Sequence, residues 1–98
     1  MIETLIAPLV QTIEINMPCH LGFHLRVVGR FVTLVKRFSS TIRVRKGEIT
    51  ADGKSIMGLL LLAVAWKSKL EIEVAGDDAV HVISGIKEFF DQESVSLG

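Results

Sequence analysis

The sequence predicts an α+β domain, an open-faced β-sandwich in which a four-stranded antiparallel sheet carries three helices on one face. Two observations support this fold class. Stretches of alternating apolar and polar side chains interchange with stretches of helical spacing, in the order β-α-β-β-α-β-α. The chain has 98 residues, which is enough for one hydrophobic core. Because we find no repeat, linker or low-complexity segment, residues 1–98 are interpreted as a single domain.

Two patterns define the first half of the fold. Residues 11–17 alternate between apolar and polar side chains, which predicts a half-buried strand, and residues 1–10 are interpreted as an N-terminal extension before it. Pro18 ends the pairing of this strand because proline has no amide hydrogen to donate. Residues 25–37 repeat apolar side chains every three or four positions, which predicts a helix with one buried face. The apolar positions of this helix are Val28, Phe31, Val32 and Val35.

The second half of the chain adds the remaining elements. Alternation and helical spacing predict strands at 41–46, 48–51 and 69–75 and helices at 56–62 and 79–91. Ser55 directly precedes the short apolar helix and is interpreted as its N-cap. Residues 92–98 are expected to form a frayed tail.

Composition excludes several classes of protein. Hydrophobic residues make up 49% of the chain and charged residues 22%, so the chain is not intrinsically disordered. No apolar run reaches the roughly 18 residues that span a bilayer, and Glu3 stands where a secretory signal would be basic. The single cysteine, Cys19, permits no internal disulfide. We therefore expect a cytoplasmic protein without membrane insertion, and a monomer by default.

One histidine, His24, lies where the first predicted strand gives way to the first predicted helix. The first backbone N–H groups of a helix have no intrahelical partner, and together with the helix dipole they favour an anion. The amides of Leu25 and Arg26 and the planar guanidinium of Arg26 are therefore candidate phosphate ligands. The same helix end disfavours imidazolium, so a neutral His24 ring is a candidate nucleophile. These residues predict a site that holds a phosphoryl group.

Two motifs resemble the HPr family, the histidine-containing phosphocarrier proteins of the bacterial phosphotransferase system. Residues 22–26, Gly-Phe-His-Leu-Arg, are similar to the family's Gly-Leu-His-x-Arg-Pro-Ala. Residues 52–58, Asp-Gly-Lys-Ser-Ile-Met-Gly, resemble its regulatory-serine segment, and the resemblance extends over residues 11–92. The chain has Val27 and Val28 where the family has Pro and Ala, so it looks like a divergent member.

The resemblance implies a phosphoryl carrier. Enzyme I, charged from phosphoenolpyruvate, would donate a phosphoryl group to Nδ1 of His24 beside Arg26, and the carrier would pass it to a sugar-specific acceptor protein. Ser55 would be modified by a serine kinase/phosphorylase. The surface that docks Enzyme I would lie next to Ser55, and the residues assigned to partner binding are Ile56, Met57, Leu60 and Phe23. No metal and no cofactor are expected.

Two other functions are compatible with parts of the sequence. The first is a regulatory binding module of the same fold, which would act through Ser55 and its apolar neighbours rather than through phosphotransfer. The second is a nucleic-acid-binding domain that uses residues 26–46, where seven basic residues occur without an acid. We disfavour nucleic acid because the predicted strands carry few aromatic side chains on which bases could stack.

Three further residues have open assignments. Cys19 and His20 could join His24 as metal ligands, but three ligands on one loop without a fourth seldom close around zinc. Cys19 is otherwise a small apolar filler, unless the helix N-terminus lowers its pKa. Trp66 is either an anchor for a partner or a core residue packed against residues 1–10.

Overall fold

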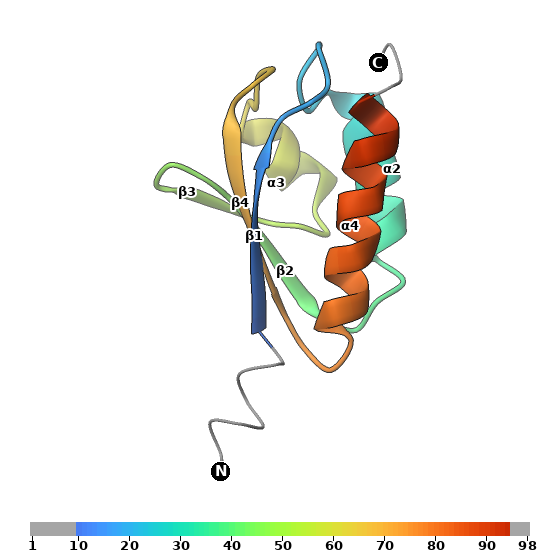
Figure 1. Cartoon of the computed structure of the whole chain (residues 1–98). Coiled ribbons are helices and arrows are strands. Elements are labelled where there is room, and N and C mark those ends of the chain that lie inside the picture. Colours follow the sequence, from blue (N-terminus) through green and yellow to red (C-terminus); the bar gives the residue numbers. More distant parts are fainter. Residues whose placement is uncertain (1–9, 95–98) are drawn as a thin grey trace.

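The computed structural model describes residues 10–94 and confirms the predicted α+β fold (Figure 1). The elements follow in the order β1 (Val10–Asn16), α2 (Leu25–Val35), β2 (Thr41–Lys46), β3 (Ile49–Asp52), α3 (Ile56–Leu61), β4 (Lys69–Ala75) and α4 (Ala79–Ser94). The strands form one antiparallel sheet in the order β1-β4-β2-β3. Between residues 10 and 94, no helix is both long and apolar enough to cross a bilayer.

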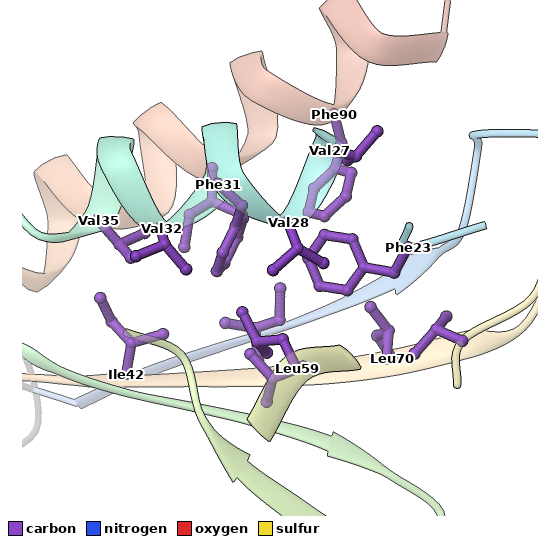
Figure 2. Packing of buried hydrophobic residues seen from close by; sticks show 14 of the residues in the cluster. Phe23, Val27, Val28, Phe31, Val32, Val35, Ile42, Leu59, Leu70 and Phe90 are labelled. Atoms are coloured by element: carbon purple, nitrogen blue, oxygen red, sulfur yellow. The ribbon is translucent and has the colours of Figure 1, made fainter. Parts of the chain in front are cut away.

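The hydrophobic core lies between the sheet and the helices (Figure 2). Strand β4 is central, and its alternation buries every second side chain against the helices. Helix α2 faces the sheet with the apolar stripe that its sequence spacing predicts. The four predicted positions, Val28, Phe31, Val32 and Val35, are buried, and Val27 is buried with them. Each such side chain removed from water stabilises the fold by roughly 1.5–3 kcal/mol, so α2 is held firmly along its length.

The predicted boundaries are confirmed at β2 and β4 and shifted elsewhere. Helix α2 ends at Val35 rather than at residue 37, because the Arg37 and Phe38 amides donate to carbonyls three residues earlier and tighten the last turn. Residues 92–94, which we expected to fray, belong to α4. The predicted extension begins outside the described residues, and Val10 is already part of β1.

A continuous α4 is explained by one long-range ion pair. The Arg30 guanidinium on α2 donates to Oε2 of Glu93 at 3.0 Å, and Glu93 is only 6% exposed. This contact joins residues 63 positions apart in the sequence. A local pattern contains no information about such a pair, which is why the last turn was predicted to be a tail.

The carboxylate of Asp78 ties the start of β2 to the start of α4. It accepts hydrogen bonds from the Ser39 amide at 2.9 Å and the Ser40 amide at 3.1 Å, and also from both serine hydroxyls. Because these donors stabilise the ionised form, with the Ser40 hydroxyl contributing most, they lower the pKa of Asp78 to about 2. Gly76 completes the junction, since a Cβ there would lie 2.4 Å from the Ser40 Oγ atom.

The hydrogen bonds to Asp78 predict that the free energy of unfolding decreases at acidic pH. The pKa of Asp78 falls from its ordinary 3.8 to about 2 on folding, so its contribution is fully present above pH 4 and is lost as the pH falls toward 2. Asp78→Asn is therefore expected to unfold at lower urea concentration at pH 7 and to lose less stability between pH 4 and pH 2 than the parent chain. Asp77→Asn, at the exposed neighbour, is the matched control. Equal acid sensitivity of Asp78→Asn and the parent would contradict the assignment.

Candidate functional site

His24 is the N-cap residue of α2, where the sequence places it. Its backbone is extended, with φ −88° and ψ 173°, and its carbonyl accepts the first helical hydrogen bond from the Val28 amide at 2.8 Å. The imidazole makes no capping hydrogen bond, and the first turn of α2 contains no acidic residue. The positive end of the helix dipole is therefore neither capped by the side chain of its N-cap residue nor neutralised by a carboxylate of its own first turn.

The two residues before His24 are held against the loop that follows α3. Gly22 has φ +75°, and a Cβ at this position would lie 2.3 Å from the Val64 carbonyl oxygen. The Phe23 amide donates to the same oxygen at 2.9 Å. Only glycine adopts this backbone conformation without strain and leaves room for the approach. The entry of the chain into α2, and with it the place of His24, is set by these backbone contacts.

Phe23 is a core residue, and its assignment to partner binding is wrong. Its side chain is 4% exposed, and its ring lies 5.5 Å from that of Phe31 and 6.1 Å from that of Phe90, measured between centroids. Figure 2 shows the ring pointing from the loop into the space beneath α2. Phe23 lies in a loop, where no regular spacing of apolar residues indicates which side chains are buried. Phe23 anchors the loop and is not available to a partner.

A surface groove runs from the first turns of α2 to the start of α3. Its lining residues are Leu25, Arg26, Gly29, Arg30, Thr33 and Ile56. Leu25 and Arg26 are both exposed, so the guanidinium that follows His24 by two residues faces the groove and solvent. The structure therefore brings Leu25 and Arg26 of the first motif to the same groove as Ile56 of the second.

Ser55 caps α3 as predicted. Its backbone is extended, and its Oγ atom accepts a hydrogen bond from the Gly58 amide at 3.0 Å. Directly after this cap, Ile56 and Met57 are exposed, whereas Leu60 is half-buried and packs against the core. Of the residues assigned to partner binding, Ile56 and Met57 thus present the larger apolar surface.

The Arg30–Glu93 pair and its surroundings were not found by sequence reasoning. Oε1 of Glu93 is buried and has no hydrogen-bond partner, while Oε2 bonds Arg30. Burial raises the pKa of the Cys19 thiol, the Glu93 carboxylate raises it further, and Arg26 partly opposes both. The helix N-terminus therefore does not activate Cys19, which is a buried filler. The charges of Glu93 and Arg26 thus both act on Cys19.

The structure also bears on the alternative that Cys19, His20 and His24 bind a metal. Within residues 10–94, no group of three histidine, cysteine, aspartate or glutamate side chains is placed to hold a metal ion. Cys19 is buried, and the ring of His20 packs edge-on against Trp66 with 4.8 Å between centroids. Cys19, His20 and His24 therefore do not form a metal-binding cluster.

The basic stretch is divided among several places in the fold. Arg45 forms an ion pair with Glu71 across the outer face of the sheet, and Arg43 lies opposite Glu73 in the register. Lys46 donates to the Leu62 and Ala63 carbonyls, at 3.3 Å and 2.9 Å. Much of the charge between residues 26 and 46 is thus matched locally, which weakens the hypothesis of a continuous basic surface for nucleic acid.

Several known proteins are similar to this chain. A family model described as the PTS HPr component phosphorylation site matches residues 11–92. The phosphocarrier protein HPr of Neisseria meningitidis serogroup A is 35% identical over 78 residues, which is 80% of this chain and 85% of that protein. HPr of Treponema pallidum is 36% identical over 69 residues, or 70% of this chain and 78% of that protein.

The fold agrees with these sequence relationships. The crystal structure of HPr-C-His from Thermoanaerobacter tengcongensis superposes with a TM-score of 0.83 at 27% identity. The superposition covers 88% of this chain and 97% of that structure. The motif around His24, the position of that histidine at the start of α2 and these similarities lead to one conclusion: the chain belongs to the HPr family of phosphocarrier proteins.

Proposed function

We propose that this protein carries a phosphoryl group on His24, which it accepts from Enzyme I and passes to a sugar-specific acceptor protein. The observation that supports this most strongly is the position of His24 at the start of α2, without an acid in the first turn and with Arg26 exposed beside it. A regulatory module that acts through Ser55 alone would need none of these features. Family membership favours the carrier over that alternative.

The transfer itself requires a neutral imidazole. The lone pair of Nδ1 attacks phosphorus, a P–N bond forms to His24, and the bond between phosphorus and the donor breaks. The proton on Nε2 stays on the ring, and the reverse step delivers the phosphoryl group to the acceptor. The protein contributes position and charge: the backbone amides at the start of α2 and the Arg26 guanidinium receive the negative oxygens. A carrier charged from phosphoenolpyruvate works in the cytoplasm, where that compound is made.

The first prediction concerns the phosphorylated residue. Incubated with purified Enzyme I and ³²P-labelled phosphoenolpyruvate, the parent chain is expected to gain one acid-labile phosphate per molecule, and His24→Ala none. His81→Ala, at an exposed histidine on α4, is the matched control and should label like the parent. Equal labelling of His24→Ala, or no labelling of the parent, would end the proposal.

The second prediction concerns Arg26. A hydrogen bond from a charged donor contributes about 1.5–3 kcal/mol, so Arg26→Ala should lower kcat/KM for phosphorylation by about 10- to 100-fold. Arg37→Ala, at an exposed arginine just beyond the other end of α2, should leave the rate unchanged. Rapid-quench kinetics with Enzyme I measure both variants. A normal rate in Arg26→Ala would remove this guanidinium from the site.

We further propose that phosphorylation of Ser55 by a serine kinase/phosphorylase weakens docking of Enzyme I. The α3 cap tolerates an anion because helix N-termini favour negative charge. A phosphate there adds nearly two negative charges next to exposed Ile56 and Met57, which are proposed to meet Enzyme I together with Leu60. Burying that charge in an apolar interface costs desolvation energy, so the complex is destabilised while the fold is not.

The third prediction separates charge from capping at Ser55. Aspartate and asparagine cap helices about equally well, so Ser55→Asp and Ser55→Asn form a matched pair that differs mainly in charge. Ser55→Asp is expected to raise the KM of Enzyme I for this protein by about tenfold, which corresponds to 1.4 kcal/mol, while Ser55→Asn stays near the parent value. Identical KM values for the two variants would show that charge at this position does not control docking.

A further inference from the structure

We propose that Trp66 forms part of the surface that docks Enzyme I and inserts its indole into an apolar recess rimmed by carboxylates on that partner. This inference rests on the proposed function and extends its docking surface beyond α2 and α3. Trp66 is the only tryptophan of the chain and lies in the loop between α3 and β4, with 47% of its surface exposed. Exposed tryptophans that anchor an interface commonly contribute more binding energy than other residues.

The indole is held by its neighbours on the surface. The His20 ring packs edge-on against it at 4.8 Å, and the Lys67 ammonium lies 4.4 Å from the ring centroid. Leu21, next to His20, is also exposed. The cluster formed by His20, Leu21, Trp66 and Lys67, which we call the Trp66 cluster, thus combines apolar area with the Lys67 ammonium. An anchor already ordered before binding loses less conformational entropy when a partner covers it.

The loop that carries Trp66 is strained and firmly tied. Ala63 and Lys67 have φ values of 52° and 70°, a region that non-glycine residues rarely adopt. The Lys46 ammonium maintains this conformation because it donates hydrogen bonds to the Leu62 and Ala63 carbonyls. Two backbone hydrogen bonds hold the far end of the loop. The Lys67 amide donates to the Met17 carbonyl at 2.9 Å, and the Met17 amide donates to the Ser68 carbonyl at 2.8 Å. Strain that the rest of the structure maintains is typical of functional segments.

The Trp66 cluster is continuous with the site of His24. The Val64 carbonyl, in the same loop, accepts a hydrogen bond from the Phe23 amide and lies against Gly22. Gly22 precedes His24 by two residues. Figure 1 shows the loop after α3 and the loop before α2 at the same end of the molecule. The loop also follows directly on α3, which carries Ile56 and Met57. A protein that reaches His24 across α3 therefore meets Trp66 as well.

The charge of the surface around the Trp66 cluster indicates what kind of partner would bind there. Residues 18–47 and 53–70, which supply these loops, α2 and α3, contain no aspartate or glutamate. Arg26 and Lys67 give this part of the molecule a positive charge. An acidic rim on the partner complements it, whereas a second copy of this chain would bring like charges together. The exposed side chains of Leu21, Ile56 and Met57 favour a protein over a polyanion without apolar surface.

The test uses steady-state kinetics with Enzyme I and phosphoenolpyruvate. Trp66→Ala is expected to raise the KM of Enzyme I for the carrier by about tenfold with kcat unchanged, and Trp66→Phe should recover part of the loss. Val80→Ala is the matched control, because Val80 is 58% exposed and lies in the first turn of α4. Figure 1 shows that α4 begins at the end of the molecule opposite the loop after α3. Thermal melts followed by circular dichroism establish that each variant folds.

A second readout locates the contact directly. With 5-fluorotryptophan incorporated, the chain has one ¹⁹F resonance, which should shift and broaden when Enzyme I is added. An unchanged resonance together with an unchanged KM for a folded Trp66→Ala would overturn the inference while leaving phosphorylation of His24 intact. A resonance that responds only to an acceptor protein would likewise overturn the assignment to Enzyme I. Failure of the parent chain to be phosphorylated at all would instead sink the proposed function.

Discussion

The close approach of the Gly22 and Val64 backbones determines where His24, the proposed phosphoryl acceptor, lies. With φ +75° at Gly22 and no space for a Cβ, the chain turns against the loop after α3 and enters α2 two residues after Phe23. The Phe23 ring fills the core below, and its amide is bound to Val64. His24 is therefore held between a fixed loop and a fixed helix, and its backbone has little freedom to move from the helix N-terminus.

The N-caps of α2 and α3 have different roles. Ser55 satisfies its own helix, because its hydroxyl accepts the Gly58 amide. His24 leaves the start of α2 without a side-chain cap, and that helix is long and packed along its whole buried face. A rigid element whose open end meets solvent suits a site that must receive and release an anion. The short, self-capped α3 suits a docking surface, since its cap holds the geometry while Ile56 and Met57 are exposed.

The sequence predicted the features that depend on local patterns and missed those that depend on contacts between distant segments. Period-two alternation specified β2 and β4 to the residue, and the apolar stripe from Val28 to Val35 specified the buried face of α2. Local patterns were also enough to predict Ser55 as an N-cap and to place His24 at the start of a helix. Contacts between distant segments were not predictable: Phe23 became a core ring because Phe31 and Phe90 surround it, and α4 reached Ser94 because Glu93 pairs with Arg30. No pattern within a short window contains either pairing.

The most direct test of a phosphoryl group held at the start of α2 is NMR of the ¹⁵N-labelled chain before and after phosphorylation by Enzyme I. The expected result is a phosphohistidine ³¹P signal coupled to the His24 ring, with the largest amide shifts at Leu25 and Arg26 as their N–H groups bind the new oxygens. Phosphorylation of His20 or His81 would contradict the central claim. So would phosphorylated His24 with the Leu25 and Arg26 amides unmoved, since the helix N-terminus would then play no part in holding the group.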